Sequence, residues 1–172
     1  MKNSTLLKMI FASLFAALTF VGTYFAVPLP FGYFNFGDCF ILLCAWLVGG
    51  IYGVLGGAIG AMLADIVLGY ASYAPATFVI KAVMVVVAFA LFKAFSKGKK
   101  GFVYVGYAVG AVLAELIMAG GYYLFESALY GFIPALASVP GNLLQGTVAI
   151  VSAIAIISIL EATGLSSKIR KG

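Results

Sequence analysis

The sequence predicts an all-α integral membrane protein, a bundle of six transmembrane helices whose N and C termini both lie in the cytoplasm. Of its 172 residues, 65% are hydrophobic and 9% are charged, whereas soluble domains carry about 25% charged residues. A helix needs about 20 mostly apolar residues to cross a bilayer, so six helices with short connections use nearly the whole chain. We therefore expect one transmembrane domain, residues 1–172, and no separate soluble domain.

The first expected helix runs from about Leu6 to Val27. Pro28 and Pro30 end it, because proline lacks a backbone N–H and restricts the residue before it. A signal peptide has a shorter apolar region of about 7 to 15 residues, followed by a small-residue cleavage site. Since the apolar stretch here starts at Met9 and ends in prolines, a retained helix is the better interpretation.

Turn-forming residues divide the rest of the chain. An aromatic and glycine-rich loop is expected over residues 29–38, where the Asp38 carboxylate suits the positive end of the next helix dipole. Gly49 and Gly50 permit a tight reversal. The expected helices cover residues 38–48, 52–68, 76–95, 102–126 and 141–161, with a loop over 127–140. Residues 38–69 could also divide into unequal or tilted spans, and this alternative stays open.

The basic residues indicate the orientation. With six crossings, nine of the ten Lys and Arg residues fall on one side of the membrane: Lys2, Lys8, Lys93, Lys97, Lys99, Lys100, Lys168, Arg170 and Lys171. Cytoplasmic loops carry the excess of Lys and Arg in membrane proteins, so both termini are expected in the cytoplasm. The net charge of +5 then reflects topology, and no nucleic acid is expected as a partner.

The residue types exclude several kinds of chemistry. The chain has no histidine, and its two cysteines, Cys39 and Cys44, fall on different faces of one expected helix, so no His-based triad or metal cluster is expected. The phosphate-binding pattern GxxxxGK[ST] is absent from the sequence, and no nucleophile has an evident base. We expect neither a cofactor nor an enzyme activity.

Small residues recur at four-residue spacing along three expected helices. The stripes are Ala12 and Ala16; Gly56, Gly60 and Ala64; and Gly106, Gly110 and Ala114. Such stripes allow helix backbones to approach closely in lipid, where packing drives association. Packing within the bundle is the interpretation for the second and third stripes. For Ala12 and Ala16, internal packing and docking on a partner protein both stay open.

Lys81 is the tenth basic residue, and it lies about one turn into the expected helix 76–95 from the outer loop. An ionisable side chain at membrane depth is costly and is therefore a candidate for a functional role. It requires a counter-ion, for which Asp38, Asp65 and Glu115 are all candidates. A purely structural ion pair is the alternative interpretation.

Most other polar side chains also fall in the outer half of the bundle. Glu115, Tyr122 and Glu126 share one helix face that climbs outward, and Asn142 and Gln145 share a face near the outer end of the last helix. The outer loops above them are rich in aromatic residues: Tyr33, Phe34, Phe36, Tyr70 and Tyr73. Polar groups beneath aromatic rings are typical of a pocket for a small, flat, hydrogen-bonding molecule, although such rings also suit a membrane-interface belt.

Four motifs occur in order along the chain: Tyr33-Phe-Asn-Phe-Gly-Asp38, Ala64-Asp-Ile-Val-Leu-Gly-Tyr70, Ala74-Pro-Ala-Thr-Phe-Val-Ile-Lys81 and Pro140-Gly-Asn-Leu-Leu-Gln145. With these motifs the chain resembles a substrate-binding S component of an energy-coupling factor (ECF) vitamin transporter. It is most similar to the riboflavin-type group, which also contains pyridoxine and hydroxymethylpyrimidine relatives. The resemblance covers nearly the whole chain.

The resemblance implies a multi-pass protein of the bacterial cell membrane that captures a water-soluble vitamin from outside. Its partners would be the lipid bilayer, a transmembrane T protein and two cytoplasmic ATPase subunits, and it would topple in the membrane to release the substrate inward. Ala12 and Ala16 match the small residues that dock on the T protein in that family. The short loops and compact length favour pyridoxine or hydroxymethylpyrimidine over riboflavin.

Residues from several of these segments are expected to bind the vitamin: Tyr33, Asn35, Asp38, Asp65, Tyr70, Lys81, Glu115, Tyr122, Asn142 and Gln145. Two other functions stay open, a self-sufficient ion-coupled carrier and an intramembrane enzyme or scaffold. A carrier favours inverted repeats and helices broken at the midplane, and no convincing repeat is evident in the sequence. The vitamin-binding subunit is therefore the predicted function.

Overall fold

The computed structural model describes residues 3–29, 32–96, 98 and 100–164. In this part of the chain, five helical segments are long and apolar enough to cross a membrane. They contain α1 (Asn3–Tyr24), α3 (Gly50–Val67), α4 (Ala74–Phe95), α5 (Lys100–Tyr130) and α7 (Val139–Ala162). A sixth helix, α2 (Gly37–Leu47), has 11 residues and measures about 16 Å, roughly half the hydrocarbon core. The predicted bundle of six helices is confirmed, with one helix too short to cross the membrane alone.

The connection between α1 and α2 differs from the expected loop. α1 ends at Tyr24, and β1 (Val27–Leu29) pairs with β2 (Gly32–Phe34) in an antiparallel hairpin. Pro28 lies within β1, which is possible because each strand of a two-stranded hairpin has a free edge where no N–H is needed. The prediction that the first helix continues to Val27 was therefore wrong.

The expected loop over residues 127–140 is largely helical. α5 continues to Tyr130, and α6 (Phe132–Ala135) and the 3-10 turn η1 (Leu136–Ser138) lead into α7. Gly131 lies between α5 and α6 with a φ of 92°. Glycine adopts a positive φ at little steric cost, so this residue allows the chain to reverse direction.

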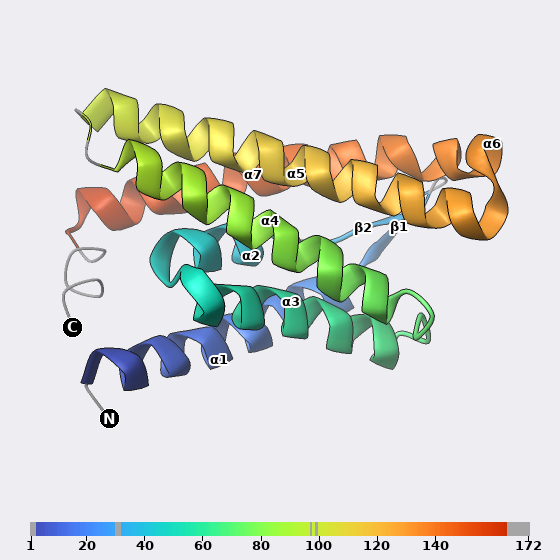
Figure 1. Ribbon diagram of the computed structural model, residues 1–172, viewed down its shortest axis with the longest axis horizontal. Helices are drawn as coiled ribbons and strands as arrows, with labels where there is room; N and C mark the ends of the chain where they lie inside the picture. Colours follow the sequence, from blue (N-terminus) through green and yellow to red (C-terminus); the bar gives the residue numbers. More distant parts are fainter. Residues whose placement is uncertain (1–2, 30–31, 97, 99, 165–172) are drawn as a thin grey trace.

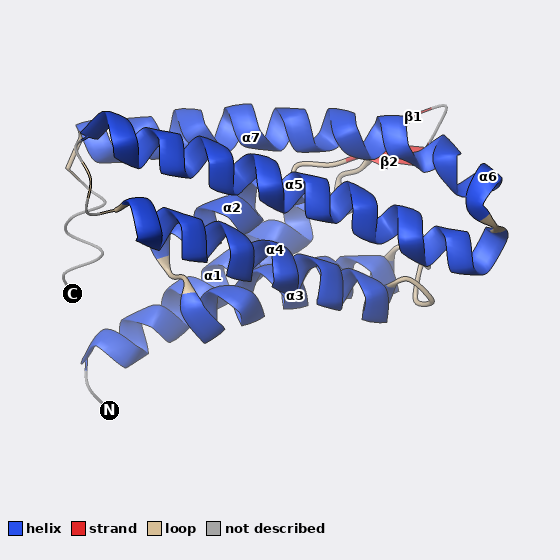
Figure 2. Ribbon diagram, turned by 45° about the horizontal axis from the view of Figure 1, so that its top comes forward, coloured by secondary structure: helices blue, strands red, loops and turns tan. Residues whose placement is uncertain are grey.

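The two ends of the bundle differ in what they contain. α1 begins and α7 ends at the same end, while the hairpin and α6 lie at the opposite end (Figure 1). Figure 2 shows the two strands beside α7, with helices forming the rest of the described bundle. We call the hairpin end the outer end. Its position outside the cell follows from the positive-inside rule and stays a prediction.

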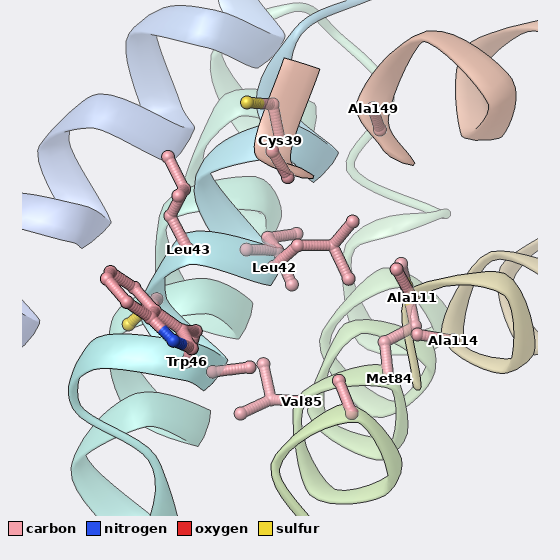
Figure 3. Packing of buried hydrophobic residues seen from close by; sticks show 14 of the residues in the cluster. Cys39, Leu42, Leu43, Trp46, Met84, Val85, Ala111, Ala114 and Ala149 are labelled. Atoms are coloured by element: carbon pink, nitrogen blue, oxygen red, sulfur yellow. The ribbon is translucent and has the colours of Figure 1, made fainter. Parts of the chain in front are cut away.

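α2 occupies the centre of the bundle, in contact with α1, α3, α4 and α7. Its residues Ile41 and Leu42 are 0% and 1% exposed. Figure 3 shows Leu42 in one cluster with Met84 and Val85 of α4 and Ala114 of α5. Because lipid is as apolar as these side chains, close packing rather than removal from water holds the helices together.

The small-residue stripe of α3 packs directly on α1. A Cβ on Gly56 would lie 2.8 Å from the carbonyl oxygen of Ala12, and a Cβ on Gly60 would collide with the backbone of Ala16. Glycine permits this approach because it has no side chain. Packing within the bundle is thus confirmed for this stripe.

Ala12 and Ala16 therefore face α3 within the chain. Ala12 is 8% exposed and Ala16 is half-buried, so the contact with α3 leaves little of the Ala12 side chain for another protein. Their docking on a partner stays a prediction. The stripe of α5 packs in a similar way, since a Cβ on Gly110 would lie 2.7 Å from the Phe92 ring of α4.

Candidate functional site

A cavity of about 230 Å³ lies in the outer half of the bundle. Its lining comes from α1, α3, α4, α5, α7 and the outer connections: Thr23, Asn35, Ala61, Asp65, Tyr70, Tyr73, Thr77, Lys81, Tyr122, Glu126, Ser138, Gly141, Asn142 and Gln145. Seven of the ten residues predicted from the sequence are among them: Asn35, Asp65, Tyr70, Lys81, Tyr122, Asn142 and Gln145. The remaining three are Tyr33, Asp38 and Glu115.

A buried ion pair adjoins the cavity, with Lys81 in the lining and its partner Asp38 outside it. Lys81 Nζ of α4 lies 2.5 Å from Asp38 Oδ1 of α2, so Asp38 is the direct counter-ion among the three candidates. Gln145 of α7 donates from Nε2 to Asp38 Oδ2 at 2.6 Å. Asn35 donates from Nδ2 to Gln145 Oε1 at 2.9 Å. These four residues, which we call the basal network, are each 5% exposed or less.

The residues just before α2 explain the geometry of this network. Asn35 Oδ1 accepts a hydrogen bond from the Gly37 backbone N–H at 2.8 Å. A Cβ on Gly37 would lie 2.9 Å from Asn35 Oδ1 and would collide with Thr23, so glycine allows α2 to begin against α1. Asp38 then falls in the first turn of α2, where the helix dipole stabilises a carboxylate.

A second polar group forms one wall of the cavity. Thr77 Oγ1 donates to Asp65 Oδ2 at 2.5 Å, and the Tyr122 hydroxyl lies 3.0 Å from the same threonine oxygen. Because a threonine hydroxyl has one proton, Tyr122 is the donor in the second bond. We call these three residues the Asp65 chain. Lys81 Nζ lies 5.4 Å from the centre of the Tyr122 ring, within cation–π range.

Glu126 joins two outer connections at the mouth of the cavity. Its carboxylate accepts a hydrogen bond from Ser138 of η1 and one from Tyr73, which precedes α4, at 3.5 Å. Tyr70 lies edge-on to Tyr73 with a centroid distance of 6.3 Å. Burial, with Tyr130 and Glu126 nearby, raises the pKa of the Tyr73 phenol, so this hydroxyl stays a donor at neutral pH.

Glu115 lies near Asp38 and Lys81 of the basal network but outside the cavity lining. Its side chain is 5% exposed, and neither carboxyl oxygen has a hydrogen-bond partner among the described residues. It packs against α7, where a Cβ on Gly146 would lie 2.9 Å from the Glu115 Cβ, and it interacts electrostatically with Asp38 and Lys81. Glu115 is absent from the cavity lining, so its predicted contact with a ligand gains no support from the geometry.

Some cavity residues were not predicted from the sequence. Thr23, Thr77 and Ser138 line the cavity but carried no evident signal by themselves. Thr77 lies four residues before Lys81 and hence on the same helix face, which could have identified it. The backbone of Tyr33 belongs to β2, and its side chain lies outside the described part of the structure.

Comparison with known proteins extends over the whole bundle. The family model for the S component of the ECF-type riboflavin transporter matches residues 3–162. The thiamine precursor transporter HmpT of Lactococcus lactis subsp. cremoris (strain MG1363) is 26% identical over 175 residues, covering 99% of this chain and 98% of the relative. An uncharacterised protein of Pyrococcus woesei is 37% identical over 126 residues, covering 73% of this chain and 80% of the relative.

The matched segment contains every cavity-lining residue named above. Both the family and the Lactococcus relative are transporter components rather than enzymes, as expected from the lack of a nucleophile with a base. Together with the membrane-length helices, the match makes this chain a multi-pass protein of the cell membrane. The chain belongs to the family of S components of ECF-type riboflavin transporters.

Proposed function

We propose that the chain is the substrate-binding subunit of an ATP-driven importer and captures a small water-soluble vitamin or vitamin precursor from outside the cell. The cavity carries this proposal, because polar side chains of several helices converge on it from within the bundle. Polar groups at membrane depth are costly, and here they surround one cavity at one end of the molecule. Concave sites with a few convergent polar groups are typical of small-molecule binding.

A substrate with one aromatic ring, such as pyridoxine or hydroxymethylpyrimidine, fits this site better than riboflavin. The cavity of about 230 Å³ is smaller than the roughly 300 to 1,000 Å³ of typical ligand sites, whereas riboflavin has three fused rings and a sugar-alcohol chain. Tyr70 and Tyr73 at the mouth can pack on a single ring. The name of the Lactococcus relative, a thiamine precursor transporter, supports the same size class.

The energy for import comes from partner proteins. The sequence lacks the phosphate-binding pattern of a P-loop ATPase, and ECF-type importers combine an S component with other subunits. A transmembrane T protein and two cytoplasmic ATPase subunits are the partners that the family supports. The isolated chain is therefore expected to bind its substrate without accumulating it.

Binding to the purified chain tests this function. The chain is extracted in detergent without added vitamin, and the small molecules that it releases on denaturation are identified by mass spectrometry. Pyridoxine, hydroxymethylpyrimidine and riboflavin are then titrated by calorimetry, and we expect about one molecule of a one-ring vitamin per chain. A folded chain that binds none of the three contradicts the proposal.

A pair of variants tests whether the substrate binds in this cavity. Gln145→Leu removes a cavity-lining amide that also links Asp38 to Asn35. It should weaken binding about two- to tenfold, since a typical hydrogen bond contributes about 0.5 to 1.5 kcal/mol. Glu161→Gln is the control, because Glu161 accepts a hydrogen bond from Tyr107 at the inner end. Equal affinity of both variants would place the site elsewhere.

Vesicle uptake separates the importer from a self-sufficient carrier. Vesicles that contain the chain alone should bind the vitamin but not concentrate it. Vesicles that also contain the T protein and ATPases should concentrate it when ATP is supplied inside. Concentrative uptake by the chain alone under an ion gradient would favour the carrier.

A further inference from the structure

The charged side chains that line the cavity differ in whether they have a counter-ion. Within the described residues, Lys81 and Asp38 form the only ion pair, so the one basic side chain of the lining already has its counter-ion. Asp65 also lines the cavity, is 2% exposed and has no cation at ion-pair distance in the described structure. A buried carboxylate in this position favours a ligand that brings a positively polarised hydrogen.

The hydrogen-bond directions in the Asp65 chain lead to the same conclusion. Thr77 donates its single proton to Asp65, and Tyr122 donates its proton to Thr77. Both protons thus point along the chain toward the carboxylate. Lone pairs of the Tyr122 oxygen and of the Asp65 carboxylate remain for a ligand, so this wall of the cavity accepts hydrogen bonds.

The basal network has the opposite polarity. The Lys81 ammonium has three hydrogens, and one of them is directed at Asp38. The others can be donated to an acceptor in the cavity, which Lys81 lines. The cavity therefore has a donor side at Lys81 and an acceptor side at Asp65.

We propose, building on the function proposed above, that the substrate is a small heteroaromatic molecule with an exocyclic amino group and that Asp65 selects it. The amino hydrogens bond to Asp65 and Tyr122, while a ring nitrogen or hydroxyl oxygen of the same molecule accepts from Lys81. An aminopyrimidine with a hydroxymethyl substituent carries both kinds of group on one ring. A carbonyl in place of the amino group would place its acceptor oxygen against the acceptor oxygens of Asp65.

The first test compares two ligands on the unaltered chain. One is hydroxymethylpyrimidine in its amino form, and the other is its oxo analogue, in which a carbonyl replaces the amino group. Calorimetric titration should show about ten- to hundredfold tighter binding of the amino form, which is the range for one hydrogen bond to a charged group. Equal affinities or a preference for the oxo analogue overturn the inference.

Two further outcomes separate this inference from the proposed function. If the chain binds pyridoxine or riboflavin but neither pyrimidine, the inference about the amino group fails while the vitamin-binding function stands. If a folded chain binds no vitamin, both fail.

The second test changes the selecting residue. Asp65→Asn keeps the size of the side chain but replaces one acceptor with a donor, so affinity for the amino form should fall about ten- to hundredfold while affinity for the oxo analogue does not fall. Glu161→Gln makes the same chemical change at the inner end and should preserve the preference. Equal weakening of both ligands by Asp65→Asn would assign Asp65 a structural role and overturn the inference. The ligand comparison on the unaltered chain remains decisive if the variant does not fold.

Discussion

The outer and inner halves of this bundle are held together by different interactions. In the outer half, the basal network and the Asp65 chain join α2, α3, α4, α5 and α7 through buried polar side chains. In the inner half, Leu42 and Met84 belong to an apolar cluster, and Gly110 of α5 allows close contact with α4. From this difference we predict that stability and substrate binding depend on largely separate residues, and variants can test how separate they are.

Lys81→Met should have the largest effect, because Lys81 pairs with the buried Asp38 and is also proposed to bind the substrate. It leaves the Asp38 carboxylate, which is 1% exposed, without a cation, and loss of one partner of a buried ion pair costs about 3–5 kcal/mol. We expect a large fall in the thermal unfolding temperature of the ligand-free chain, together with loss of binding. Fluorescence-monitored unfolding in detergent measures the first and calorimetry the second.

A double variant distinguishes charge from packing at this position. Lys81→Met combined with Asp38→Asn removes the unpaired charge while it keeps an oxygen to accept from Gln145. It should recover most of the lost stability but not the binding. A double variant as unstable as Lys81→Met would assign the loss to packing.

Gly60→Val tests the packing of α3 on α1, with an expected cost of about 1–3 kcal/mol, the usual range for overpacking. A Cβ at this position would collide with the Ala16 backbone, so the helices must separate. Gly120→Val is the matched control, because a Cβ on Gly120 would meet no atom within 4 Å. The yield of monodisperse protein and its unfolding temperature should fall only for Gly60→Val; equal effects would mean that α1 can shift without loss.

Glu115→Met should raise stability, by about 1 kcal/mol, because it removes a buried carboxyl that has no hydrogen-bond partner among the described residues. Glu126→Met is the control, since Glu126 accepts hydrogen bonds from Ser138 and Tyr73. In the described structure, its loss leaves these hydroxyls only their contacts with the Ala135 carbonyl oxygen and the Tyr130 hydroxyl. Opposite shifts of the unfolding temperature are expected. A fall for Glu115→Met would show that the Glu115 carboxyl is stabilised by its neighbours.

The orientation of the two halves can be tested without a change in stability. Ser72 in the α3–α4 connection and Ser96 after α4 are both exposed, and the native Cys39 and Cys44 are 3% and 0% exposed. In intact cells, an impermeant thiol reagent should label Ser72→Cys and leave Ser96→Cys unlabelled until the membrane is permeabilised. The reverse pattern would invert the assignment of the outer end.

The helices could be predicted because an apolar run of membrane length is a strong local signal. The hairpin could not, since β1 and β2 have three residues each, too few to show a strand period, and lie among prolines, glycines and aromatic residues. The length of α2 is likewise unclear from an apolar sequence that continues through Gly49 into α3.

Residues of the site could be predicted singly but not their partners. Lys81 was evident as a charge at membrane depth, yet its pairing with Asp38 joins positions 43 residues apart, and Asp65 and Glu115 satisfied the same local criteria. The choice among them depends on how α2 lies against α4, which no short pattern in the sequence contains. The stripes of α1 and α3 were also evident, but their contact was not.

The short α2 has an electrical consequence. The cavity lies next to the first turn of α2, and the helix below it measures about 16 Å from its 11 residues. If the cavity opens to the outside as predicted, water that enters it carries the external potential inward, and we expect most of the membrane voltage to fall across the half of the bundle that contains α2. A charge moved through the whole field gains about 2.3 kcal/mol per 100 mV, and a charged ligand that enters the cavity crosses only a small part of this field. With the predicted orientation, we therefore expect binding from outside to be nearly independent of voltage and the voltage to act on the later inward step.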